Sequence, residues 1–249
     1  MKRYCLLFTV FILTMSNVFG KIKNGYEKDI LQTRESLKRY SALLHASNNL
    51  TSYQRRKIEH RIDSLVSDIS NYELTANLLE QFKVISPALY NEIDTLKDSR
   101  GKNVKVYVKF IPRVDAKIDV WGVTCMSPLG NDKEAYGSEY GKSTVSIKIW
   151  IANNALVVLA HELGHVKYQI PHFSTYMKYY RENYALNMDP AYTLGHSPDD
   201  LSGKSAAQYV KRFRKEYSYF LKMRKEKLQS PLILIDRIKK NLTNARINT

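Results

Sequence analysis

Three residues whose types and spacing can support metal chemistry lie together in the segment His161-Glu162-Leu163-Gly164-His165. Two imidazoles four residues apart project from the same face of a helix, within reach of one ion. Glu162 is rotated aside from that pair, so its carboxylate can take a proton from a zinc-activated water without binding the metal itself. The pattern predicts one zinc ion per chain, with His161 and His165 as ligands and Glu162 as the general base.

The residues around this segment predict that the helix carrying it is buried. Residues 155–160 are all apolar, and Leu163 and Val166 continue the pattern, which indicates a helix at about 153–169. Burying two imidazoles and a carboxylate in apolar surroundings costs free energy unless they have a partner. A metal ion supplies that partner, so the apolar context favours a zinc site over a chance match to the spacing.

Residues 158–166 resemble the active-site helix of the zincin metallopeptidases, with Gly164 where many members have glycine. Lys167 departs from the apolar residue usual at the end of the extended motif, and the resemblance covers about residues 144–190. It implies hydrolysis of a peptide or protein substrate, with His161 and His165 as zinc ligands and Glu162 as general base. It also implies a small sheet lying above the helix.

The resemblance leaves the third zinc ligand open between two residues. In the metzincin branch a histidine follows the second one by six residues with a glycine between them, but here Pro171 and Tyr168 hold those positions. In the gluzincin branch a glutamate comes from the next helix, which favours Glu182 on a helix expected at about 174–188. His172, which follows Pro171 in the connection, is the alternative ligand.

Other polar residues near the predicted site have less defined roles. Thermolysin-like members have an aspartate four residues after that glutamate, where this chain has Leu186. Asn187 and Asp189 can orient the ligands instead. His196 is a candidate donor to the oxyanion that develops during acyl transfer.

Residues 21–98 predict a helical N-terminal region. Apolar residues repeat at a helical period in two runs: Ile30, Leu37 and Leu44 with Leu31 and Leu43 beside them, then Ile58, Ile62, Leu65 and Ile69. Residues 47–49 separate the runs and Thr51 can cap the second helix, so the two helices can pack as an antiparallel hairpin. Ser86-Pro87 begins a further helix. His45 and His60 are expected at the surface.

After residue 99 the hydrophobic period changes from about 3.6 to 2. Segments 104–111 and 144–151 alternate apolar with polar residues and predict half-buried strands, and residues 119–126 predict a shorter third strand. A last helix is expected at about 203–228, with Tyr209, Phe213, Tyr217 and Phe220 as its core face. The sequence therefore predicts an α+β fold in which residues 99–249 form a zincin-like metallopeptidase domain.

Residues 1–20 have the layout of a secretory signal peptide. Lys2 and Arg3 precede an apolar run from Cys5 to Met15, and small residues follow, ending at Gly20. The run is short for a membrane span, so we expect a secreted or periplasmic protein, with an uncleaved N-terminal anchor as the alternative. After cleavage Cys125 would be the one cysteine of the mature chain, which excludes an internal disulfide.

The charge of the chain points to anionic partners. Its 249 residues are 44% hydrophobic, enough for a substantial core, and carry a formal net charge of +15 that is concentrated in the last third. These cations predict either a solvated helix face or contact of the basic C-terminal helix with an anionic surface. No nucleic-acid partner is expected, because aromatic platforms do not alternate with the basic residues in a recognisable nucleic-acid fold.

Two alternatives to an active peptidase remain. The first is a zincin-like module that binds metal without catalysis, and the second is a basic protein that binds anionic surfaces. Glu162 argues against the first alternative, because a structural zinc site has four protein ligands and needs no base.

Overall fold

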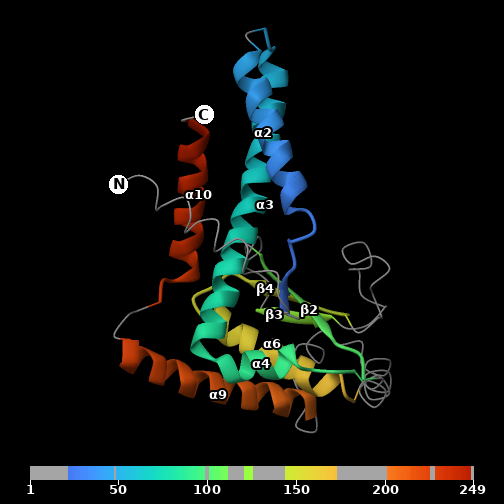
Figure 1. The fold of residues 1–249 in the computed structure, drawn as a ribbon. Coiled ribbons are helices and arrows are strands. Elements are labelled where there is room, and N and C mark those ends of the chain that lie inside the picture. The colour runs from blue at the N-terminus through green and yellow to red at the C-terminus, as the bar shows by residue number, and fades with distance from the viewer. Residues whose placement is uncertain are drawn as a thin grey trace, which may run out of the picture.

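A computed structural model describes residues 22–47, 49–98, 101–111, 121–125, 144–172, 201–224 and 228–247. Within these residues the chain forms six helices and a four-stranded sheet (Figure 1), which confirms the α+β class. The elements in chain order are β1 (Ile22–Asn24), α2 (Ile30–Ala46), α3 (Ser52–Ile85), α4 (Pro87–Asp94), β2 (Lys105–Ile111), β3 (Gly122–Cys125), β4 (Thr144–Trp150), α6 (Ala155–Gln169), α9 (Leu201–Arg224) and α10 (Pro231–Ile247).

The strands form one mixed sheet in the order β1-β2-β4-β3. β1, β2 and β4 are parallel, and β3 pairs antiparallel with β4. The two strands predicted from the alternating pattern are confirmed as β2 and β4, and the shorter third strand expected at 119–126 is confirmed as β3. The three-residue strand β1 is not anticipated by the sequence pattern.

The alternating apolar residues of β2 and β4 form the inner face of the sheet. Val108 and Phe110 pair with Ile147 and Ile149, and all four side chains are fully buried. The sequence predicts that the other face of these strands is exposed. This face is also buried in part, since the paired residues Tyr107 and Ser146 are both buried.

The two N-terminal helices form the predicted antiparallel hairpin (Figure 1). Thr51 begins α3 with a reciprocal cap: its hydroxyl accepts a hydrogen bond from the Gln54 backbone N–H at 3.2 Å, while its own N–H donates to Gln54 Oε1 at 3.0 Å. Of the predicted apolar stripe of α3, Ile62, Leu65 and Ile69 are buried and Ile58 is half-buried. Leu31 and Leu43 of α2 are exposed. Because α2 packs mainly on α3, it buries only a narrow stripe of its own surface.

The hydrophobic core runs across residue 98 without interruption. Side chains of α3 and α4 pack in one cluster with side chains of the sheet, α6 and α9. The rings of Phe82 and Phe213 stack with centroids 4.9 Å apart, which joins α3 directly to α9. The N-terminal helices therefore share their core with the elements that carry the candidate site.

The two C-terminal helices cover different parts of this core. α9 confirms the helix expected at about 203–228, and its predicted core residues Tyr209 and Phe213 are buried. α10 packs along α3 through Leu234 and Ile235 and is not anticipated by the sequence pattern. The helix expected at about 174–188 lies outside the described residues. Within the described ranges, no helix is both long and apolar enough to cross a membrane.

Candidate metal centre

Helix α6, which carries the predicted zinc ligands, is enclosed by the sheet and by α9. It contacts β3 and β4 on one side and α9 on the other, and Figure 1 shows it between the sheet and α9. Leu159, Ala160, Leu163 and Val166 are fully buried. The prediction that this helix is buried is confirmed.

The two predicted histidine ligands lie next to each other. The Nε2 atoms of His161 and His165 are 3.0 Å apart, and the planes of the two rings are 82° from parallel. Two nitrogens that bind one tetrahedral zinc ion at about 2.0–2.1 Å lie about 3.3 Å from each other. A shift of a few tenths of an ångström would therefore let both imidazoles bind one ion.

Ser202, at the start of α9, fixes the orientation of the second imidazole. Its Oγ lies 2.7 Å from Nδ1 of His165, and both side chains are buried. When Nδ1–H donates to the serine hydroxyl, Nε2 presents its lone pair toward His161. The sequence does not reveal this contact, because the two residues are 37 positions apart on different helices.

The side chain of Glu162 contacts β3, which packs beside α6. The side chain is only 5% exposed, and the Thr124 hydroxyl donates a hydrogen bond to its Oε2 at 2.5 Å. A buried carboxylate needs such donors because it has lost its hydration shell. Thr124 therefore holds Glu162 in the narrow space between α6 and β3.

Gly122 of β3 makes this close approach possible. A Cβ at Gly122 would lie 2.6 Å from Oε1 of Glu162 and 2.7 Å from Cγ1 of Val158. No side chain fits between the strand and the helix at this point. Because Gly122 has no side chain, Glu162 can lie directly beneath the backbone of β3.

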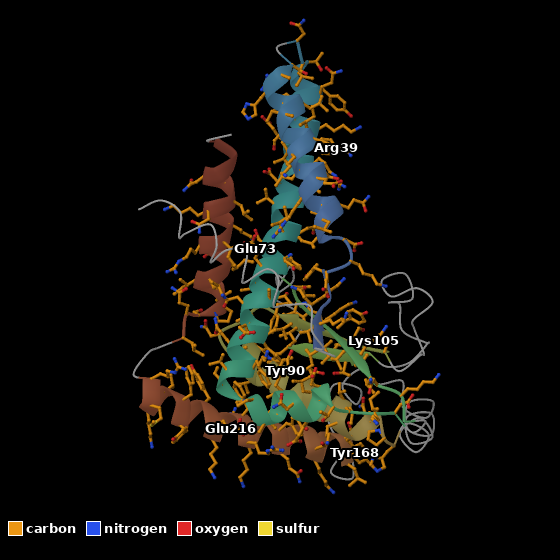
Figure 2. The ribbon with its side chains drawn as sticks, viewed as in Figure 1. Arg39, Glu73, Tyr90, Lys105, Tyr168 and Glu216 are labelled. Carbon is orange, nitrogen blue, oxygen red and sulfur yellow. The ribbon has the colours of Figure 1, made fainter. Side chains whose placement is uncertain are left out.

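A cluster of polar side chains joins α9 to α4. Glu92 accepts hydrogen bonds from the Tyr209 hydroxyl at 2.7 Å and from Nη2 of Arg212 at 2.6 Å. The Arg212 hydrogen bond lowers the pKa of Glu92, whereas burial raises the pKa of Tyr209. Near the other end of α4, the Ser86 hydroxyl donates to Glu216 of α9, which Figure 2 labels. α9, and with it Ser202, is thus tied to the core at several points.

The other predicted site residues lie apart from the two imidazoles or outside the described ranges. His172 is exposed after the end of α6, where its Nδ1 lies 3.0 Å from the carbonyl oxygen of Tyr168 and the two rings stack. Figure 2 labels Tyr168 near that end. Among the described residues, no three His, Cys, Asp or Glu side chains gather closely enough to hold a metal ion.

The predicted third ligand falls in an undescribed segment. Glu182, together with Asn187, Asp189 and His196, lies in the range 173–200, which the structure does not describe. Glu182 therefore stays a prediction. The surface positions predicted for His45 and His60 are confirmed, since both are exposed.

Comparisons with protein-family models, with curated proteins and with solved structures find no match to this chain.

Proposed function

We propose that this chain is an exported, zinc-dependent metallopeptidase with a zincin-like arrangement of sheet and helix. One observation carries the proposal: the Nε2 atoms of His161 and His165 lie 3.0 Å apart on the buried helix α6. A divalent cation that is shared by two histidines requires their nitrogens to lie this close. It also requires each ring to be oriented, which a hydrogen bond from the other ring nitrogen does for His165.

The donor set fits zinc. Zinc binds imidazole nitrogen readily and accepts a carboxylate oxygen as a further ligand. His161 and His165 would hold one ion per chain, with Glu182 as the proposed third ligand. When bound, zinc supplies a Lewis acid that polarises the scissile carbonyl and acidifies water.

Glu162 acts in this proposal as the general base. The hydrogen bond from Thr124 and the close backbone of β3 hold its carboxylate beside the helix. From there it accepts a proton from the attacking water and passes it to the departing amine, which are the proton transfers that peptide hydrolysis requires. Its burial limits the rearrangement needed before that step.

The position of β3 supports an extended peptide as the substrate. β3 is the last strand of the sheet in the described part of the chain, and it contacts α6. An extended peptide that pairs with a sheet edge gains backbone hydrogen bonds regardless of its sequence. A peptide added outside β3 would lie along the strand whose residues Gly122 and Thr124 contact Glu162.

Export is supported by the signal-peptide pattern of residues 1–20. The first described element, β1, begins at Ile22, two residues after Gly20, where the signal-peptide pattern ends. Cleavage after Gly20 would leave all four described strands in the mature chain. The mature protein would then act in a secreted or periplasmic location.

Glu162→Gln separates catalysis from metal binding. We expect the parent chain to contain about one zinc by elemental analysis and to cleave a mixed peptide library. Glu162→Gln should retain the zinc and lose hydrolysis, because the amide keeps the shape of the side chain but cannot accept a proton. Glu80→Gln, an exposed change on α3, should leave both unchanged.

The outcomes distinguish the alternatives. Zinc far below stoichiometry after reconstitution would overturn the proposal. Stoichiometric zinc without hydrolysis by the parent would identify a metal-binding module without catalysis. Equal loss of zinc and hydrolysis in Glu162→Gln would give Glu162 a structural role.

A further inference from the structure

The outward side of α9 carries a straight row of cations. Lys204, Lys211, Lys215 and Lys222 are all exposed, and they follow one another at intervals of seven, four and seven residues. At 100° per residue they lie within about 40° of each other around the helix axis and span about 27 Å. We call these residues the lysine row. It lies opposite the buried side of α9 that carries Tyr209 and Phe213.

The acidic side chains of α9 are too few to neutralise the lysine row. Glu216 is the one acidic residue of α9, and its carboxylate accepts the hydrogen bond from Ser86 on the inner side. Exposed Arg214 and Arg224 add to the positive charge of α9. Figure 2 shows nitrogen-tipped side chains projecting from α9 away from the rest of the molecule.

Apolar side chains are exposed beside the lysine row. Tyr219 is 65% exposed and Met223 is 66% exposed, and their spacing of four residues makes them neighbours on the helix surface. Tyr219 also follows Lys215 by four residues, so the apolar pair borders the row. Exposed Leu201 adds a third apolar side chain at the start of the helix.

We infer that the outward side of α9 binds an anionic phospholipid bilayer. Lysines near an anionic leaflet bind by electrostatic attraction, and a tyrosine with a neighbouring methionine can enter the interfacial layer beside the headgroups. A soluble polyanion would use the lysines but gives no reason for the exposed Tyr219–Met223 pair. Nucleic acid is less suited, because Tyr219 is the one strongly exposed aromatic residue of α9 and provides no series of stacking platforms.

Binding through the outward side of α9 would determine which parts of the molecule face the membrane. α9 lies at one end of the molecule and the α2–α3 hairpin extends toward the other (Figure 1). The bilayer would contact α9 directly, with α6 behind it and the hairpin pointing into solution. The inference does not depend on the proposed peptidase activity.

Vesicle sedimentation of the full chain tests the inference. The parent should bind vesicles that contain roughly one third phosphatidylglycerol, bind poorly to pure phosphatidylcholine, and release as salt is raised. Replacing the four lysines of the row by glutamine should weaken binding by about 600-fold, because each basic residue near an anionic leaflet contributes about fivefold. Binding in a zinc chelator should be unchanged, which separates this surface from the metal site.

The matched control removes the same charge elsewhere. Four exposed lysines away from α9, Lys28, Lys38, Lys57 and Lys240, are replaced by glutamine. This variant should keep its affinity within about threefold, since only charges within a Debye length of the leaflet contribute strongly. Arginine at the four row positions should also preserve binding, and circular dichroism should show that all variants are folded.

Three results would overturn the inference. Equal losses in the two glutamine variants would mean that net charge rather than the lysine row drives binding. Retained binding in the row variant would exclude α9 as the contact. A parent chain that binds duplex DNA but not anionic vesicles would make the lysine row a polyanion site. Weaker vesicle binding by Tyr219→Ser/Met223→Ser than by the parent at the same salt concentration would support insertion of the apolar pair.

Discussion

Gly164 of α6 and Ala206 of α9 bring the two helix backbones into contact. A Cβ at Gly164 would lie 2.5 Å from Cα of Ala206 and 2.9 Å from the carbonyl oxygen of Ser205. Glycine inside a helix costs about 1 kcal/mol relative to alanine, so this close packing has to offset that loss. The contact also sets the distance from Ser202, one turn earlier on α9, to His165, which directly follows Gly164.

Gly164→Ala is therefore expected to destabilise the protein although alanine is the better helix former. The added methyl group meets backbone atoms, which cannot rotate away, and overpacking of this kind costs about 1–3 kcal/mol. Urea unfolding measures the change. Ala207→Leu, an exposed substitution on α9, should change stability by less than about 0.5 kcal/mol. Equal or greater stability of Gly164→Ala would show that the two helices separate at little cost.

Ser202→Ala should weaken zinc binding by about 10- to 100-fold without removing a ligand. The alanine leaves Nδ1 of buried His165 without its hydroxyl partner, so the ring is no longer held with Nε2 toward His161. Competition with a chelator measures the affinity. Ser218→Ala removes a hydroxyl of the same helix that bonds the Arg214 carbonyl, and it should leave zinc affinity unchanged. Equal affinities in both variants would contradict an orienting role for Ser202.

The variants Glu182→Ala and His172→Ala test which of the two residues is the third zinc ligand. Metal affinity is shared among few bonds, so Glu182→Ala should lose zinc at concentrations where the parent retains it. His172→Ala should keep the zinc stoichiometry of the parent, because this exposed imidazole lies against Tyr168. Zinc titration of the two variants side by side gives the answer. Loss of zinc in His172→Ala alone would reject the gluzincin-like assignment while leaving the histidine pair in place.

Glu92→Gln should change the dependence of stability on pH. Arg212 lowers the pKa of folded Glu92 below its usual value of 4.5, so the unfolded chain takes up this proton more readily. The interaction therefore stabilises the fold above pH 4.5, and its contribution is lost as the pH falls through the lowered pKa.

Because both side chains are partly exposed, Glu92→Gln should cost about 0.5–1 kcal/mol at neutral pH. Denaturant unfolding of parent and variant over a pH series should show the difference disappear in acid. Glu80→Gln serves as the control at an exposed position. A difference that stays constant with pH would assign the effect to packing rather than to ionisation.

Much of the fold could be predicted because its signals are local. The cap at Thr51 depends on residues three positions apart, and the strands at 104–111 and 144–151 follow from strict alternation within seven or eight residues. The convergence of His161 and His165 likewise follows from helical geometry alone. Each of these features is encoded within one or two turns or one strand.

The features that could not be predicted depend on contacts between distant segments. Thr124 meets Glu162 and Ser202 meets His165 only after β3 and α9 have packed on α6. β1 is three residues long, too short for a periodic signal, and is stabilised by pairing with β2 about 84 residues later. Leu31 and Leu43 fit a helical repeat, but the sequence does not show how narrow a surface α2 shares with α3.

Helix α3 runs unbroken for 34 residues from solvent into the core, so its two ends differ in burial. Residues 52–57 are all exposed, whereas Leu74, Leu78 and Phe82 are fully buried. Amide hydrogens exchange when the backbone opens locally, and opening costs more where more contacts break. Exchange should therefore slow steeply along this one helix, from fast near Tyr53 to the rate of global unfolding near Phe82. The free end of the hairpin can fray and re-form while the segment beside the sheet stays closed.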